Sequence, residues 1–331
     1  MKICYLFRSK GLKQFSIENV FKYIIDELKI TFQIKSEFVP EYRIGFSEVF
    51  KNLKYAKRCH GDIIHITGDI HYISLVLPYN KTILTIHDLV GLENNKKHTI
   101  KKLLYLIFWV LIPSIKCRYI TTISNKTKED FLKICPWAKN KTFMIPDPID
   151  KRYKYIDKEF NCLRPRILLI GTSGNKNHER IIKAVKNMPC VLDIVGQLPE
   201  REKILLNELN VDYNNYYQLS DEEIIQRFIN CDIVLFASIY EGFGMPIIEG
   251  QKTGRCVITS NIEPMCEVAG EGACLVNPYD SNDIRKGLLK IIGDNLYRKN
   301  LINSGLKNAE KYSAMNIAAA YAALYEKVRK N

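Results

Sequence analysis

Short apolar runs alternate with amphipathic stretches through the first half of the chain. Four of these runs have the length and composition of strands buried on both faces: residues 2–7, 62–66, 82–86 and 118–123. After the first run, apolar residues recur at helical spacing from Ile17 to Leu28, and Ser16 precedes them as a helix N-cap. Ser124 is placed to cap another helix after the last run. We therefore expect strands and helices to alternate in this half.

A second series of the same kind follows a polar stretch. Two prolines, at positions 146 and 148, and the polar residues 151–161 indicate a linker. The segment Ser220-Asp-Glu-Glu223 is a capping box, and the tail from Asp283 has a helical pattern. Alternating strands and helices predict a parallel sheet covered on both faces, so the fold class is α/β, with two Rossmann-like domains facing across a cleft. Buried strands are expected at residues 166–171, 190–195, 232–237 and 255–259.

A glycine-rich segment connects the predicted strand 232–237 to a predicted helix. It places Glu241 and Glu249 on either side of Gly242-Phe243-Gly244, and Pro246 suits the first helical position. Glycine lets a ligand approach the backbone closely, and the free N–H groups of a helix N-terminus attract phosphate or sugar oxygens. Both carboxylates can accept hydrogen bonds from sugar hydroxyls, Glu249 from a ribose and Glu241 from a transferred sugar. The simpler alternative is a tight turn with Glu249 as a favourable helix-dipole charge.

Two further loops follow predicted strands at their carboxyl ends, where open α/β sheets bind ligands. Residues 171–177 precede a helix expected over 179–186, and they lack the Gly-x4-Gly-Lys pattern of a P-loop. His87 and Asp88 close the strand 82–86. An imidazole there can bond a sugar or assist proton movement from an acceptor hydroxyl, or the pair can simply cap the next helix.

Residues 162–331 resemble the retaining glycosyltransferases of family 4, also called group 1, which have a GT-B fold and carry Glu-x7-Glu where this chain has Glu241 and Glu249. The resemblance is weaker but continuous over 60–150. It implies that Lys176 neutralises a donor diphosphate, whereas Thr172 stands where the family often has arginine. The implied catalytic residues are His87, Lys176 and Glu241. The implied donor-binding residues are Thr172, Asn177, Gly242, Phe243, Gly244 and Glu249.

The resemblance also implies an organisation and an activity. Residues 1–150 would form an acceptor-binding domain, 151–162 a linker, 163–310 a nucleotide-sugar-binding domain, and 311–331 a helix that packs back toward the first domain. The activity would be hexosyl transfer from a UDP- or GDP-sugar to a saccharide or lipid-linked acceptor, in surface polysaccharide or glycolipid assembly. No cofactor is expected and, without an Asp-x-Asp motif, no metal. The alternatives are an epimerase or phosphorylase of the same fold, or a non-catalytic protein that binds nucleotide-sugars or nucleic acid.

Charge narrows the choice of partners. The formal net charge is +13, and residues 1–150 hold 24 Lys and Arg against 14 Asp and Glu, a difference of +10. Nucleic acid, an anionic membrane or a phosphate-bearing acceptor could use this basic half, or it could be only a solvated surface. No nucleic-acid-binding motif accompanies the charge, so we expect no nucleic acid partner. Ten cysteines without a Cys-x-x-Cys pair, and an N-terminus unlike a signal peptide, favour a cytoplasmic protein.

The segment 96–112 leaves a peripheral membrane location open. Four lysines, at positions 96, 97, 101 and 102, precede an unbroken run of ten apolar residues, 103–112. Ten residues are too few to span a bilayer, which needs about 20. The segment can be a buried core helix, or a helix in a membrane interface with Tyr105 or Trp109 at the boundary.

Overall fold

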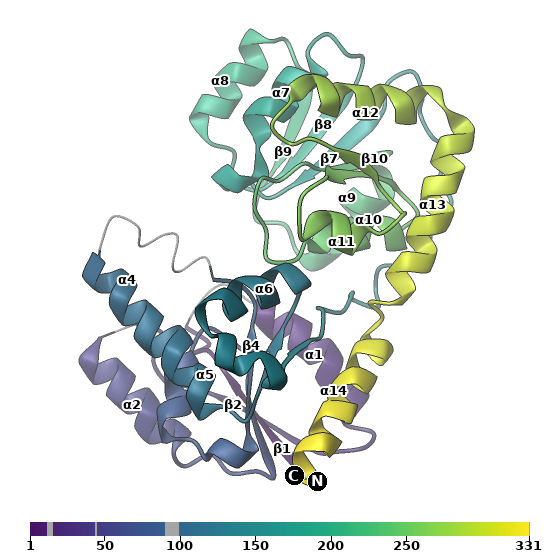
Figure 1. Cartoon of the computed structure of the whole chain (residues 1–331). Coiled ribbons are helices and arrows are strands. Elements are labelled where there is room, and N and C mark those ends of the chain that lie inside the picture. The colour runs from purple at the N-terminus through teal and green to yellow at the C-terminus, as the bar shows by residue number, and fades with distance from the viewer. Residues whose placement is uncertain (12–15, 44, 90–98, 331) are drawn as a thin grey trace. The chain divides into compact units, whose positions relative to one another are not determined.

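The computed structural model describes residues 1–11, 16–43, 45–89 and 99–330 (Figure 1). The chain forms two compact units. The first contains Met1–Asp150 and Ala314–Asn331, and the second contains Lys151–Ser313. Each unit has its own parallel sheet of six strands, covered by helices, as the alternating pattern predicted.

The first sheet has the strand order β2-β1-β3-β4-β5-β6, and all its neighbouring strands are parallel. Successive side chains of a strand point to opposite faces, so both faces of the interior strands must be apolar. The alternation is visible in β1, where Tyr5 faces one apolar cluster and Leu6 the other. The strands are β1 (Lys2–Phe7), β2 (Gln33–Phe38), β3 (Ile63–Ile66), β4 (Thr82–Ile86), β5 (Tyr119–Thr122) and β6 (Thr142–Met144).

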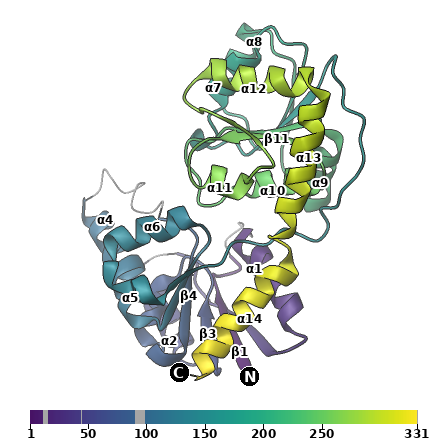
Figure 2. The same cartoon turned by 45° about the vertical axis from the view of Figure 1, so that its right-hand side comes forward.

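Different helices cover the two faces of this sheet (Figures 1 and 2). On one face lie α1 (Ser16–Leu28) and the C-terminal helix α14 (Ala314–Lys330), which pack with the Tyr5 side of β1. The helices on the other face are α2 (Phe46–Ala56), the continuous stretch α4 (Thr99–Tyr105), η3 (Leu106–Leu111) and α5 (Ile112–Lys116), and α6 (Asn125–Ile134). Ser124 caps α6 by accepting a hydrogen bond from the Thr127 N–H, as the sequence predicted.

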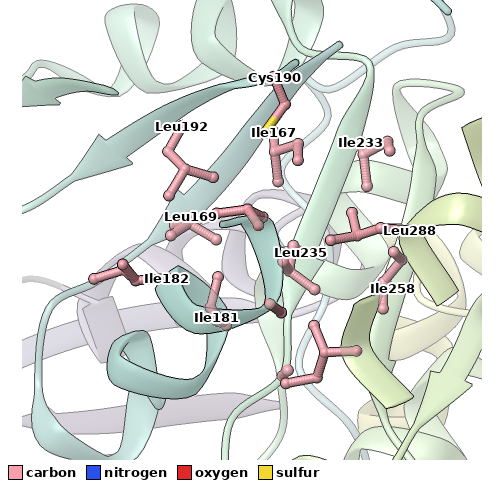
Figure 3. Packing of buried hydrophobic residues seen from close by; sticks show 14 of the residues in the cluster. Ile167, Leu169, Ile181, Ile182, Cys190, Leu192, Ile233, Leu235, Ile258 and Leu288 are labelled. Atoms are coloured by element: carbon pink, nitrogen blue, oxygen red, sulfur yellow. The ribbon is translucent and has the colours of Figure 1, made fainter. Parts of the chain in front are cut away.

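The second sheet has the order β12-β11-β10-β7-β8-β9. Its strands are β7 (Arg166–Ile170), β8 (Val191–Val195), β9 (Tyr213–Tyr216), β10 (Ile233–Phe236), β11 (Cys256–Ser260) and β12 (Cys274–Val276). Figure 3 shows the core on one face, where Leu169, Leu192 and Leu235 from three strands meet Ile181 and Leu288 from helices. The helices are α7 (His178–Val185), α8 (Glu200–Glu208), α9 (Asp221–Asn230), α10 (Met245–Lys252), α11 (Met265–Ala269), α12 (Ser281–Gly293) and α13 (Asn295–Glu310).

A buried network of hydrogen bonds links α14 to the first sheet. His65 on β3 is fully buried, with Nδ1 2.7 Å from the Tyr325 hydroxyl and Nε2 2.8 Å from the Thr85 hydroxyl. The Tyr325 hydroxyl also lies 2.7 Å from that of Tyr5 on β1. Burial lowers the pKa of His65 to about 3, with the charge of His87 as a smaller cause. The imidazole is therefore neutral at physiological pH and serves as a hydrogen-bonding group inside the core.

The segment 99–116 is both core and surface. Trp109 and Val110 are buried, as the core interpretation requires, whereas residues 100–104 are exposed. Pro113 lacks the N–H that would bond the Trp109 carbonyl in an α-helix, and His71 Nδ1 lies 2.7 Å from that oxygen instead. Since a carbonyl only accepts, Nδ1 carries the proton. The placement of Trp109 at a membrane boundary is thus wrong, and Lys96 and Lys97 lie outside the described residues.

The two buried histidines predict acid sensitivity of the first unit. Burial lowers the pKa of His65 to about 3 and that of His71 to about 4, from 6.5. Because the unfolded chain binds the protons first, stability is complete above pH 6.5 and falls as the pH drops toward the folded values, by about 2 kcal/mol per histidine at pH 5. Urea unfolding at pH 7 and pH 5 measures the loss. His65→Gln should flatten the profile, and the exposed His60→Gln should not.

Candidate functional site

Two loops of the second unit meet at the carboxyl edge of its sheet. The loop 171–177 follows β7 and the loop 239–244 follows β10, and these two strands are neighbours. The Ile239 N–H donates to the Asn175 carbonyl over 2.9 Å, and the Asn175 amide donates to the Tyr240 carbonyl over 2.9 Å. The strand order therefore joins segments that are more than sixty residues apart in sequence.

Lys176 and Glu241 form the centre of this junction. Lys176 Nζ lies 2.7 Å from Glu241 Oε1, and the Asn175 amide donates to the same oxygen over 3.0 Å. Both charged side chains are largely shielded, with 16% and 15% of their surface exposed. The ammonium also sits 4.4 Å from the centre of the Phe236 ring, within cation–π range. The residue predicted to bind a diphosphate and the residue predicted to bind a sugar thus lie in contact.

Gly171 gives Lys176 its position. Its φ of +85° belongs to the region that favours glycine, and a Cβ here would lie 2.8 Å from Lys176 Cε. The lysine stem consequently folds over the start of the loop. Thr172 turns toward the next strand, where a Cβ on Gly196 would lie 2.9 Å from the Thr172 methyl carbon.

Asn177 shapes the loop from inside. It is buried, has a φ of 63°, and directly precedes α7. Its amide nitrogen donates to the carbonyls of Ala237 and Pro278, over 3.0 and 2.6 Å, and its amide oxygen accepts from Arg180 over 2.9 Å. Both amide hydrogens are used within the protein, so Asn177 fixes the loop rather than offering its amide to a ligand.

The glycine-rich turn begins α10 as the sequence predicted. Gly244 is the N-cap with a φ of +119°, and Pro246 lies in the first turn. Phe243 is buried and its ring packs edge-on against Tyr312 at 5.6 Å, so its side chain is part of the core. Gly242 and Glu249 are half-buried, Glu249 being the fifth residue of the helix. This arrangement presents helix N–H groups beside the Lys176–Glu241 pair, which suits an anionic ligand.

His87 belongs to the first unit, at the carboxyl end of β4. Its Nε2 donates to the Thr67 carbonyl over 2.9 Å, which leaves Nδ1 as the acceptor nitrogen. Nδ1 is 3.9 Å from Asp147 Oδ2, too far for a hydrogen bond. Burial raises the pKa of Asp147, and a charge on His87 opposes that rise. The alternative that His87 and Asp88 cap the next helix concerns residues 90–98, which lie outside the described residues.

The segments that follow β1 and β3 contain further polar side chains. Arg8 forms an ion pair with Glu18 through two hydrogen bonds of 3.0 and 2.8 Å, so its charge is compensated. His71 is buried and donates a hydrogen bond to the Trp109 carbonyl. Sequence reasoning missed Asp69. Desolvation of its carboxyl group and the nearby charge of Asp88 raise the pKa of Asp69 to about 7, although part of the residue is exposed to solvent. Its position three residues after the end of β3 was the available signal.

Comparison with known proteins matches part of the chain to a family model. Residues 163–308 match the model of glycosyl transferases group 1. The serotype-specific mannosyltransferase WbdA of Escherichia coli is 24% identical over 72% of this chain. An MMP alpha-(1->4)-mannosyltransferase of Mycolicibacterium hassiacum is 26% identical over 63% of this chain and 54% of its own length. The aligned part of this chain spans only 32% of WbdA, about a third of that protein's length.

Solved structures show the same fold over nearly the whole chain. The Anabaena protein Alr3699/HepE, solved with UDP and glucose, has a TM-score of 0.76 at 16% identity, over 99% of this chain and 100% of that one. WaaG, described as a glycosyltransferase of lipopolysaccharide biosynthesis, has a TM-score of 0.71 at 14% identity, over 98% and 99%. The α/β GT-B fold predicted from the sequence is thereby confirmed.

The role of Gly171 can be tested by adding one methyl group. Gly171→Ala should destabilise the second unit by about 1–3 kcal/mol, because alanine resists the positive φ and meets the Lys176 stem. Gly174→Ala is the matched control in the same loop, since a Cβ there meets nothing within 4 Å. Urea unfolding of both variants measures the difference. Equal stabilities would mean that the loop has another conformation.

Proposed function

We propose that the chain, whose residues 163–308 match the model of the group 1 glycosyl transferases, is a retaining, family 4 glycosyltransferase. It moves a sugar from a nucleoside diphosphate sugar to a saccharide or lipid-linked acceptor, in the assembly of a surface polysaccharide or glycolipid. The observation that carries the proposal is the Lys176–Glu241 contact of 2.7 Å beside the N-terminus of α10. A cation and a cluster of helix N–H groups suit the diphosphate, and a neighbouring carboxylate suits the sugar.

In this proposal Lys176 stabilises the leaving group. Breaking the bond between the sugar and the diphosphate places negative charge on the diphosphate, and a preorganised cation lowers the energy of that transition state. A bound diphosphate also competes with Glu241 for the ammonium, so donor binding would free Glu241 to accept hydrogen bonds from the sugar. Thr172 adds no cation, so Lys176 is the charge that this loop supplies. We propose on this basis that the transfer is independent of metal ions, with EDTA leaving the rate unchanged.

Glu249 would hold the nucleotide, with its carboxylate accepting two hydrogen bonds from the ribose diol. Gly242, Phe243 and Gly244 would contribute backbone N–H groups. His87 would bond the transferred sugar or assist the proton of the acceptor hydroxyl through Nδ1, the nitrogen that does not donate to Thr67. The names of the relatives make a nucleotide-linked mannose the first donor to test, and UDP-glucose, present in one HepE structure, the second.

A thermal-shift screen of UDP- and GDP-sugars tests the donor class. A donor at about 100 times its dissociation constant should stabilise the protein by about 2.7 kcal/mol. Glu249→Ala should abolish most of this shift, because the ribose contact is common to the ground and transition states. Glu241→Ala should keep more of the shift and mainly lose turnover. Calorimetry that finds equal donor affinity for the wild type and Glu249→Ala would refute the assignment.

Lys176→Ala should reduce the transfer rate by on the order of 10²-fold or more, the usual effect of removing a preorganised stabiliser of charge. Lys183→Ala, a solvent-exposed lysine on α7, is the control. Product analysis by NMR would report the anomeric configuration in the same assay, and inversion would contradict the retaining mechanism. Transfer at the wild-type rate by Lys176→Ala would mean that the diphosphate is held elsewhere.

A further inference from the structure

Two helices of the first unit expose large apolar side chains. The exposed fractions are 101% for Phe46 and 67% for Phe50 on α2, and 75%, 53% and 48% for Ile100, Leu103 and Leu104 on α4. Spacings of four residues on α2, and of three and four on α4, put each set on one helical face. Large apolar side chains that gather on a protein surface often mark a site of interaction with another molecule or a membrane. We refer to these five residues as the α2/α4 apolar surface.

The two helices are parts of one layer. Val49 and Leu53 of α2 pack on the same core cluster as Tyr105, the last residue of α4, and Leu106, which follows it. Figures 1 and 2 both show α2 and the helix that runs from α4 to α5 on the same side of the first sheet. The α2/α4 apolar surface therefore lies on the outside of a layer whose inner side forms the core.

Basic residues outnumber acidic ones on these two helices and just beyond them. Residues 46–58 and 100–104 contain six Lys or Arg residues and a single carboxylate, Glu48. Lys101 and Lys102 are exposed between Ile100 and Leu103, and Lys54 lies four residues beyond Phe50 on the exposed face of α2. The remaining cations are Lys51, which pairs with Glu41 at 2.7 Å, Lys57 and Arg58.

We propose that the α2/α4 apolar surface binds an anionic lipid bilayer, with the Phe, Ile and Leu side chains in the interfacial region and the lysines at the headgroups. Apolar anchors together with basic residues on the same helices are the combination that such binding requires. A second copy of the chain is a poorer occupant, because a symmetric contact would bring the two sets of lysines together. No helix among the described residues is long and apolar enough to cross a membrane.

Sedimentation of the full chain with vesicles tests the proposal independently of any transferase activity. The protein should pellet with vesicles of phosphatidylcholine and phosphatidylglycerol, much less with phosphatidylcholine alone, and less as salt increases. Lys101→Gln with Lys102→Gln should weaken the partition roughly 30-fold, at about 1 kcal/mol per lysine. The control for charge is Lys22→Gln with Lys139→Gln, two exposed lysines outside this surface.

The apolar contribution needs its own variants. Phe46→Ser with Phe50→Ser, or Leu103→Gln with Leu104→Gln, should release the protein at moderate salt without changing its melting temperature, because these side chains are already exposed. Ile30→Ser, at a residue 85% exposed in the same unit, is the control. Wild-type protein that stays in the supernatant at low salt overturns the proposal. So does unchanged binding of both apolar variants, or self-association that depends on Phe46 and Leu103.

Discussion

The parallel orientation of every strand in each sheet is the constraint on which the candidate site depends. Parallel strands end at the same edge, so the loops that follow neighbouring strands meet whatever their distance in sequence. Because β7 pairs with β10, Lys176 and Glu241 come into contact. The pairing of β3 with β4 in the first sheet likewise brings Thr67 to His87. Burial of both sheet faces also forces the polar groups inside, such as His65, to find partners within the core.

The sequence predicted the interior strands and missed the edge strands, for one physical reason. The interior strands are largely buried, and most of their residues are apolar or β-branched; they are β1, β3, β4 and β5 in the first sheet, and β7, β8, β10 and β11 in the second. An edge strand is only partly covered, so its sequence need not be apolar. β2 reads Gln-Ile-Lys-Ser-Glu-Phe and β9 reads Tyr-Asn-Asn-Tyr, and both are largely open to solvent. β6 and β12, the other two edges, have only three residues each, too few to show a pattern.

The candidate site was predictable as a set of residues but not as a set of contacts. The turn at Gly244 and the start of α10 followed from local pattern, and the roles of Lys176, Glu241 and Glu249 are predictions from resemblance. The contact of Lys176 with Glu241 depends on the strand order, which periodicity does not contain. The same limit explains Asn177, whose amide is used by Ala237 and Pro278 from two distant segments. A sequence identifies hydrogen-bonding groups, whereas the fold decides which of them remain available to a ligand.

The helix that contains Trp109 shows why an apolar run alone does not separate core from surface. Packing on a sheet and insertion into a lipid interface both select apolar residues at helical spacing, so residues 103–112 satisfied both interpretations. The distinction comes from depth: Trp109 and Val110 are buried against the sheet, whereas Ile100 and Leu103 project beyond it. α2 also has both exposed and buried apolar residues, since Phe46 is exposed to solvent and Ala56 is buried. On both helices the apolar residues that the core leaves uncovered lie near lysines in the sequence, and this combination is the basis of the proposed lipid contact.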